Sequence, residues 1–546
     1  MQIPLTRISG SALVLVGGML VLSGLMTSPS LAKGGSGGAS SGSTRGGGKV
    51  ATSTPTATPT PSIAISPSTP TPTSTAAPTS TPIPTGTTSS GSGGSDGGSG
   101  GGGNGLAPLG SVVPPQPGGG TIVNQTAAVQ LGKALFWDEQ AGGDGQQACA
   151  SCHFHAGEDV SPVSNGVVAA EFVQVDPNPT VAHDDCTVTG TSRQVTGRNA
   201  PSVINAVFNR DNFWDGRANH TFNGFNPFGL TGNNTDGVLV TMTNSSLASQ
   251  SDGPANNPIE MSCAGRPFNG NNSLATKMLA RQPLQFQQVS PADSVLGPLA
   301  NPSGNGLNTT YGALVQGAFG TVDVQSNFSA IWGQAIQAYE ATLISDQTPM
   351  DRYLSGLRSA LTTNQQNGLN IFTGKGQCTV CHAGPEMTDA SVNFYLRNGA
   401  VNRDGGDQGF HNLGVRPTSE DLGRAGLGPN GVPWSVSGST FDRGAFKTPS
   451  LRNVGLRAPY FHNGGKATLN DVVSFYDRGG DFANPEKSHD LKPLSLGGSD
   501  ISALVDFLQN GLTDCRVANA AAPFDHPSLS LTSGGTLAAT GGNTCS

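Results

Sequence analysis

The pattern Cys-x-x-Cys-His occurs twice in this chain, as Cys149-Ala-Ser-Cys152-His153 and as Cys378-Thr-Val-Cys381-His382. Two cysteines at this spacing can form thioether bonds to the two vinyl groups of one haem, and the histidine that follows can ligate the iron. A zinc site would need a second cysteine pair or a histidine pair at short range, and a thiol–disulfide site would follow a strand of a β-α-β unit. Neither context surrounds these motifs. They therefore predict two covalently bound c-type haems and redox chemistry.

The first residues are typical of a secretory signal peptide. One arginine precedes an apolar run from about Ile8 to Met26, and Ser30-Leu31-Ala32 fits a small-x-small cleavage site. Glycines and serines interrupt the run, so cleavage after Ala32 is favoured over an uncleaved anchor helix. No other segment is apolar enough to span a membrane. We expect residues 1–32 to be removed and the protein to be exported, to a periplasm or an outer cell surface.

Residues 33–120 consist mainly of Gly, Ser, Thr and Pro. A segment of this composition cannot bury a core, which predicts a disordered, low-complexity linker. Repeated Thr-Pro and Ser-Thr pairs between 52 and 88 favour extended conformers, as in a stalk.

The remainder, about 400 residues, is long enough for two domains with substantial cores. The formal net charge of −8 is mild, and basic patches are absent. Nucleic acid and acidic lipid surfaces are therefore poor candidate partners. Outside the two motifs the chain has four further cysteines, an even number that suggests disulfides in an exported protein. We pair Cys186 with Cys263 and Cys515 with Cys545 as a hypothesis, although the sequence leaves other pairings open.

The two motifs need elements that position them. Apolar residues at helical spacing predict a helix over 126–136 that leads to Cys149, and one over 365–372 that leads to Cys378 in the same way. Further helices are expected over 331–343, 350–355, 470–476 and 499–508. The repeated order indicates a mainly α protein with long irregular loops and two cytochrome c-like domains, 121–348 and 349–515, followed by a tail over 516–546.

Further motifs occur in a fixed order along the chain: Arg198-Asn-Ala-Pro-Ser-Val-Ile-Asn205, Phe213-Trp-Asp-Gly-Arg217, Asn257-Pro-Ile-Glu-Met261 and Phe446-Lys-Thr-Pro-Ser-Leu-Arg-Asn-Val-Gly-Leu-Arg-Ala-Pro-Tyr-Phe-His-Asn-Gly464. Together they resemble the bacterial di-haem cytochrome c peroxidase and MauG family, from about residue 127 to 512. The resemblance implies a reactive N-terminal haem and a C-terminal haem that relays electrons.

The resemblance also assigns individual residues. Glu260 matches the distal carboxylate that moves a proton between the two oxygens of a peroxide. Gln250 and Pro254 match two other residues of the distal pocket. Trp214 matches a tryptophan that lies between the haems. Asn199, with the backbone carbonyls of Arg457 and Pro459, matches a calcium site at the domain interface, and oxygen-only ligation suits that hard cation.

Two departures from the family pattern affect the haems. Some members carry a histidine that blocks the resting reactive haem, whereas the corresponding position here is about Thr191. The first iron is therefore expected to be open at rest. Peroxidases place a methionine on the second haem at a fixed distance after the histidine of Pro-Tyr-Phe-His, and Tyr476 occupies that position here, as in MauG-like proteins. A tyrosinate lowers the haem potential relative to methionine. His462 is the competing ligand. His155 is expected to be structural or to face a propionate.

Three functions remain open. The first is reduction of hydrogen peroxide, with a small redox protein such as a cytochrome c or a cupredoxin as the electron donor. The second is a MauG-like or rubber-oxygenase-like oxidation of a protein or organic substrate, using peroxide or O2. Phe222-Asn-Gly-Phe-Asn-Pro-Phe-Gly229 resembles the oxygenases, with Phe225 or Phe228 lining an apolar pocket. The third is a surface electron-transfer cytochrome without catalysis. Either a monomer or a homodimer is compatible with the sequence.

Overall fold

In the described part of the chain, secondary structure is mainly helical, as expected, and strands occur only as two-residue pairs. The expected signal peptide (1–32), residue 191 and the proposed Cys186–Cys263 pair lie outside the residues that the structure describes. The same holds for most of the linker, 33–104. The computed structural model describes residues 105–143, 145–155, 157, 174–175, 194–231, 240–257, 260–261, 266–271, 273–531 and 535–545.

Residues 121–348, the N-terminal half, are built on a long buried helix pair, α1 and α6. Asn124 and Asp323 begin these helices by accepting hydrogen bonds from the backbone at Ala127 and Ser326. A Cβ atom at Gly132 of α1 would lie 1.9 Å from the Ala335 carbonyl oxygen of α6, so only glycine permits this approach. The helices of this half are α1 (Gln125–Trp137), α2 (Ala150–His153), α3 (Ser246–Ser251), α4 (Leu274–Leu279), α5 (Tyr311–Phe319) and α6 (Val324–Glu340).

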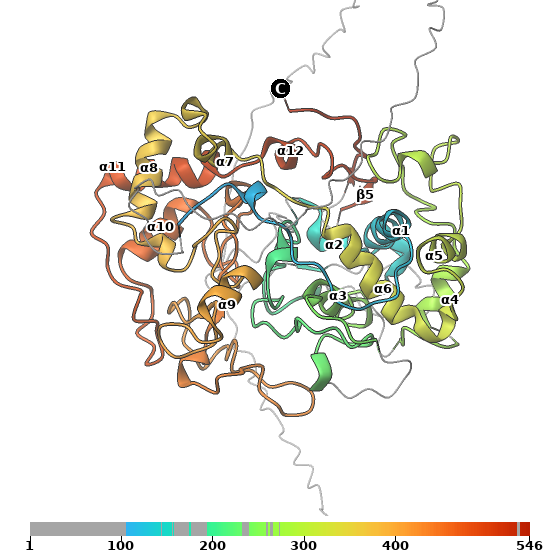
Figure 1. Ribbon diagram of the computed structural model, residues 1–546, viewed down its shortest axis with the longest axis horizontal. Helices are drawn as coiled ribbons and strands as arrows, with labels where there is room; N and C mark the ends of the chain where they lie inside the picture. The colour runs from blue at the N-terminus through green and yellow to red at the C-terminus, as the bar shows by residue number, and fades with distance from the viewer. Residues whose placement is uncertain are drawn as a thin grey trace, which may run out of the picture. The chain divides into compact units, whose positions relative to one another are not determined.

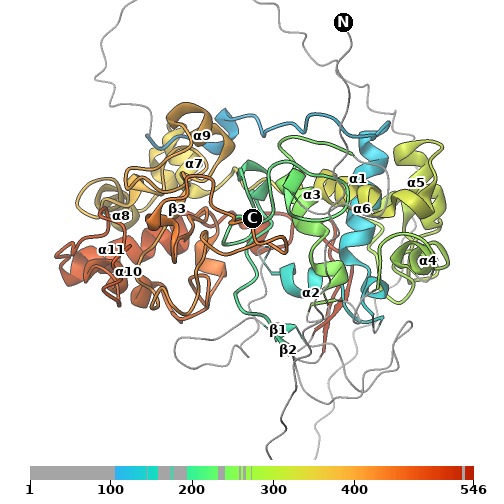
Figure 2. The same cartoon turned by 90° about the horizontal axis from the view of Figure 1, so that it is seen from below.

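Residues 349–515, the C-terminal half, have a second apolar core. A Cβ atom at Gly368 of α8 would lie 2.1 Å from the Ala503 carbonyl oxygen of α11, which repeats the close helix contact of the first half. Figures 1 and 2 show α7 to α11 together on one side and α1 to α6 on the other. The helices are α7 (Pro349–Leu354), α8 (Thr363–Thr373), α9 (Val392–Asn398), α10 (Leu469–Asp477) and α11 (Gly498–Asp506), which continues as a π-helical turn over Phe507–Gly511.

All six expected helices are confirmed, with shifted ends. The helix expected over 331–343 begins earlier, at Val324, because Asp323 caps it. The helices α3, α4, α5 and α9 were not anticipated. Short 3-10 turns join the helices, at Leu109–Ser111, Glu139–Ala141, Ala206–Phe208, Gly229–Thr231, Pro254–Asn256, Gly297–Leu299, Arg358–Ala360, Cys378–Val380, Thr440–Asp442 and Val454–Leu456.

Three antiparallel strand pairs complete the secondary structure of the described residues. They are β1 (Gln174–Val175) with β2 (Gln194–Val195), β3 (Phe410–His411) with β4 (Phe446–Lys447), and β5 (Leu529–Ser530) with β6 (Thr536–Leu537). In the second pair His411 lies opposite Phe446. None of the helices in the described ranges is long and apolar enough to cross a membrane.

The end of the expected linker is folded, which corrects the boundary at residue 120. Leu109 is 1% exposed and packs in an apolar cluster with Phe208 and Leu247. Its backbone N–H donates to Asp351 Oδ1 at 2.9 Å. The composition of residues 33–120 did not predict this, because the segment is held by a few apolar side chains and by backbone hydrogen bonds to distant parts of the chain, such as the pair between Gly118 and Thr243.

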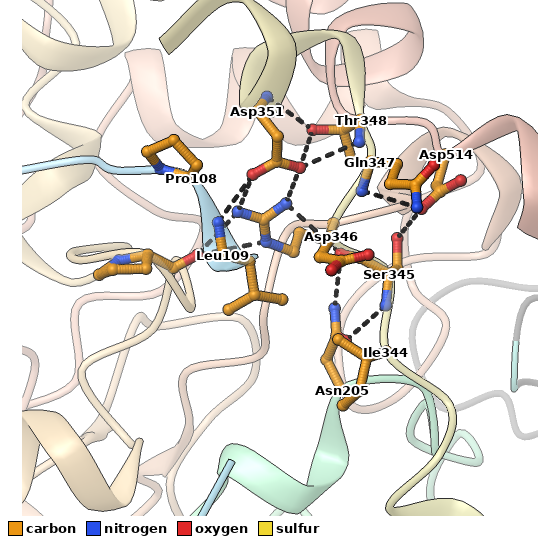
Figure 3. Close-up of polar contacts among 12 residues, drawn as sticks. Pro108, Leu109, Asn205, Ile344, Ser345, Asp346, Gln347, Thr348, Asp351 and Asp514 are labelled. Carbon is orange, nitrogen blue, oxygen red and sulfur yellow. Dashed lines mark hydrogen bonds and ion pairs between the residues drawn. The ribbon is translucent and has the colours of Figure 1, made fainter. Parts of the chain in front are cut away.

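The connection between the halves runs from α6 to α7 and is held by polar contacts (Figure 3). Asp351 binds Arg452 as well as Leu109, with a 2.8 Å contact from Arg452 Nη2 to Asp351 Oδ1. Ser345 donates its N–H to Asn205 Oδ1 at 2.8 Å, and its hydroxyl donates to Asp514. These bonds link the connection to both halves.

The C-terminal segment is more than the expected tail. The predicted disulfide between Cys515 and Cys545 is confirmed, and α12 (Cys515–Ala518) begins at the first of these cysteines. Leu529 of β5 is fully buried in the core of the N-terminal half, and Figure 1 shows β5 near α1 and α2. Asp525 binds the fully buried Lys133 of α1 at 2.9 Å. The segment thus completes the N-terminal half.

Candidate active site and the second haem cavity

The first Cys-x-x-Cys-His motif opens into a cavity of about 560 Å³. Cys149, Cys152 and His153 all line it, and both thiols are free of disulfides. His153 Nδ1–H donates to the Gly157 carbonyl at 2.9 Å, which leaves Nε2 as the nitrogen available to a metal. Burial lowers the pKa of His153, so the ring is neutral, the form that ligates iron.

The three expected distal residues lie on the wall of the same cavity. Gln250 comes from α3, Pro254 begins the 3-10 turn that follows, and Glu260 comes from the next loop. Burial raises the pKa of Glu260, although the charge of Arg217 and a hydrogen bond with Asn257 oppose the shift. A carboxyl group with a raised pKa gains and loses a proton at a pH closer to neutral than a solvated glutamate does.

The second motif has a cavity of its own in the C-terminal half, lined by Cys378, Cys381 and His382. His382 Nδ1 approaches the Met387 carbonyl oxygen at 3.3 Å, and burial lowers the pKa of His382 to about 4. The arrangement matches that of His153: a neutral imidazole oriented by a backbone carbonyl. Tyr476 of α10 and His462 both line this cavity.

Trp214 lines both cavities. Its Nε1–H donates to the Asn199 carbonyl at 2.9 Å, and its ring lies 6.4 Å from that of His462 in an edge-on contact. Asp421 also lines both cavities and binds Arg198 at 2.6 Å. The structure therefore places Trp214 on the walls of both motif cavities.

Residues 126–359 match the di-haem cytochrome c peroxidase family. The cytochrome-c peroxidase IdrP2 of Denitromonas iodatirespirans is 29% identical over 404 residues, which cover 70% of this chain and 80% of that protein. The methylamine utilization protein MauG of Methylorubrum extorquens is 26% identical over 381 residues, 70% of this chain and 77% of that protein. On these matches, the chain resembles the di-haem cytochrome c peroxidase family. It is an oxidoreductase.

Among solved structures, a MauG-like protein associated with microbial copper homeostasis matches with a TM-score of 0.49 and 24% identity, covering 73% of this chain and 92% of that one. Similarity to the di-haem cytochrome c peroxidase family implies covalently bound haem c. Both cavities fit this cofactor, because each combines two cysteines outside any disulfide with a neutral, oriented histidine.

Asn199 contacts the backbone of the segment that was expected to share a calcium site with it. Its side-chain Nδ2 lies 3.0 Å from the Pro459 carbonyl oxygen and 3.1 Å from that of Phe461, while its buried Oδ1 has no hydrogen-bond partner. Exchange of the amide oxygen and nitrogen, which have nearly the same shape, would bring three oxygens together. Phe461 was not expected here. The side chain of Arg457 donates to the Ser450 carbonyl.

Several residues singled out from the sequence lie away from the first cavity. His155 is exposed and does not line it. Phe225 and Phe228 do not line it either; Phe228 stacks on Trp434 with ring centroids 5.2 Å apart. These two phenylalanines therefore do not form the apolar pocket that resemblance to the oxygenases suggested. Among the described residues that line the cavity, His153 is the only histidine.

Two residues of the cavities were missed. His411 of β3 lines the second cavity and contacts Asp389 Oδ2 through Nε2 at 2.8 Å. Glu340, the last residue of α6, lines the first cavity and is 1% exposed. The sequence contained a signal for Glu340, because it lies one helical turn after Ile336 and therefore on the apolar side of an expected helix.

Proposed function

We propose that this enzyme reduces hydrogen peroxide to water in the cavity of the first motif, using electrons that a small redox protein delivers through the second haem. The donor would be a cytochrome c or a cupredoxin. The observation that carries the proposal is the meeting of Gln250, Pro254 and Glu260 with Cys149, Cys152 and His153 in one cavity. The relatives named as cytochrome-c peroxidases support the same reaction.

When bound, the haem supplies an iron that takes up peroxide and exchanges electrons. The chain supplies the rest of the chemistry. His153 would ligate the iron through Nε2, because its Nδ1 contacts the Gly157 carbonyl. Glu260 accepts a proton from one peroxide oxygen and returns it to the other, which turns the leaving group into water. Gln250 can donate a hydrogen bond that orients the peroxide, while Pro254 presents no donor.

Electrons would reach this cavity by way of Trp214, because its ring lies on the wall of both cavities. We propose Tyr476 as the second ligand of the C-terminal haem. The competing residue, His462, stacks on Phe446 with ring centroids 3.6 Å apart, beside Trp214. Burial lowers the pKa of His462 to about 3. A neutral His462 in contact with the rings of Phe446 and Trp214 is suited to the proposed electron-transfer route between the haems.

A MauG-like reaction is the second candidate, and Tyr476 is the observation that favours it. A tyrosinate ligand stabilises ferric and higher oxidation states of a haem, which suits storage of oxidising equivalents for a protein or organic substrate. A surface cytochrome without catalysis is the weakest candidate, because it gives Gln250, Pro254 and Glu260 no role in the cavity.

We further propose two haem domains, 121–348 and 349–515, because the two halves have separate apolar cores. The C-terminal segment would complete the first domain. Asn199, Pro459 and Phe461, with Arg457 as expected from the family, would hold a calcium ion between the domains. The signal peptide suggests export to a periplasm or an outer cell surface.

Visible and low-temperature EPR spectra of the ferric protein, before and after stoichiometric hydrogen peroxide, test the proposal. We expect one high-spin and one low-spin haem at rest and a rapid change when peroxide is added. Two low-spin haems that ignore peroxide would favour the electron carrier. Turnover of peroxide with a reduced cytochrome or cupredoxin separates the peroxidase from a MauG-like enzyme, which would instead consume peroxide while oxidising its substrate.

A further inference from the structure

Glu340 is a second buried carboxyl group in the cavity of the first motif. It ends α6, is 1% exposed, and shares the cavity wall with Ile336, one helical turn earlier. Its Oε2 atom is buried without a hydrogen-bond partner. None of the ion pairs within the described ranges involves Glu340. A polar atom buried in this way is costly, so its place on the wall of a reactive cavity needs a reason.

The surroundings of Glu340 and Glu260 differ. Burial raises the pKa of both, but only Glu260 is opposed by a nearby positive charge, that of Arg217. Glu340 therefore keeps its proton to a higher pH than Glu260 does. Two carboxyl groups with unlike proton affinities in one cavity are suited to different proton-transfer tasks. The other charged groups that line the cavity are Arg198, Asp215, Arg217, Glu420 and Asp421.

The stoichiometry of the proposed reaction leaves a task for such a group. Reduction of one hydrogen peroxide to two waters breaks the O–O bond and consumes two electrons and two protons. The electrons come from the redox partner. Glu260 moves a proton from one peroxide oxygen to the other, so it supplies neither of the two protons that the reaction consumes. Both protons must therefore enter the cavity from another source.

We propose that Glu340 stores one of these protons and delivers it while the second water forms, and that the other proton enters from solvent. The carboxylate left behind is then reprotonated from solvent before the next turnover. This inference rests on the proposed peroxidase function. It assigns the two carboxyl groups to successive steps: Glu260 acts while the O–O bond breaks, and Glu340 acts while the second water forms.

Infrared difference spectroscopy of the di-haem protein tests the assignment directly. Addition of peroxide and reduced donor to the wild type should remove intensity from the C=O band of a protonated carboxylic acid. Glu340→Gln should lack this signal. The matched control is Glu386→Gln, because Glu386 is also buried, at 2% exposure, and has a partnerless Oε2, yet it lines neither haem cavity. The control should keep the signal.

Kinetics provide a second readout. Glu340→Gln should leave the first, O–O-breaking reaction with peroxide unchanged and lower steady-state turnover about tenfold or more. Glu340→Asp, which keeps an acid, should recover part of that loss. The resting visible and EPR spectra should stay those of the wild type, which excludes loss of haem. Because the glutamine removes a buried acid and keeps its shape, we expect it to fold at least as stably.

The outcomes separate this inference from the function on which it rests. A wild type that never reacts with peroxide overturns the proposed function. A wild type that turns over peroxide without a carboxylic acid signal, or a Glu340→Gln variant that keeps the signal, overturns the role of Glu340 alone. A slower first reaction in Glu340→Gln would also overturn it, because the proton would then act before the O–O bond breaks.

Discussion

Glu260 is the residue on which peroxide reduction depends most directly. Replacement by glutamine removes the group that accepts and returns a proton, so peroxide turnover should fall by about two orders of magnitude or more. Steady-state kinetics with a reduced donor measure this, and a Pro254→Ala variant that keeps the carboxyl should lose much less. Unchanged turnover in Glu260→Gln would remove Glu260 from the mechanism.

The same carboxyl sets the pH dependence of turnover. Glu260 must be ionised to accept the peroxide proton, and burial raises its pKa above the ordinary value of 4.5. Activity should therefore be lost as the pH falls through this raised pKa, at a higher pH than for a solvated glutamate. A pH profile of kcat/KM measures the acid limb. The limb should disappear in Glu260→Gln.

Tyr476 is predicted to determine the properties of the second haem. In Tyr476→Phe the oxygen ligand is lost, so the EPR signal and reduction potential of one haem should change, the potential upward. The control is His462→Phe, which should leave both haem signals in place if His462 is not a ligand. If His462→Phe changes the low-spin signal and Tyr476→Phe does not, the two ligand assignments must be exchanged.

At the scale of elements, the C-terminal segment stabilises the helix that leads to the first haem. Lys133 of α1 is fully buried between Asp293, at 2.8 Å, and Asp525, at 2.9 Å. Lys133→Met leaves two buried carboxylates without a cation, which should lower the free energy of unfolding by about 3–5 kcal/mol. Chemical denaturation of the haem-loaded protein measures this.

The matched control for Lys133 is an exposed ion pair. Lys375 binds Asp500 at 2.7 Å, with 49% and 29% of the two side chains exposed. Because this pair is screened by solvent, Lys375→Met should leave the unfolding free energy almost unchanged. Equal losses in the two variants would show that the C-terminal segment does not anchor α1.

At the scale of the whole molecule, Trp214 connects the two reactive cavities. Trp214→Phe keeps an aromatic ring but removes the indole and its hydrogen bond to the Asn199 carbonyl. Electron transfer between the haems should slow while both haem spectra stay unchanged, as measured by stopped-flow reduction after peroxide. The control is Trp434→Phe, because Trp434 lines neither cavity. Equal rates in all three proteins would exclude Trp214 from the route.

Much of the site could be predicted from the sequence because its chemistry is local. Two cysteines and a histidine within five residues must lie close together in any fold, so haem attachment needed no tertiary information. Helical spacing predicted α1 and α8, which lead to the two motifs. Resemblance to the family then identified Gln250, Pro254 and Glu260, although their approach to Cys149 depends on the packing of α3 against α6.

Only the tertiary structure decided which distant residues meet. In the sequence, Glu340 resembles any glutamate near the end of a helix. Only the structure shows that it is buried and lines the first cavity. Asp525 lies in the expected C-terminal tail. Only the structure shows that the segment after Cys515 packs against α1 and that Asp525 binds the buried Lys133. Leu109 lies in a stretch of low-complexity composition. Only the structure shows that its side chain is buried and that its backbone N–H donates to Asp351. Burial and long-range pairing depend on how the segments pack, and local composition does not encode that packing.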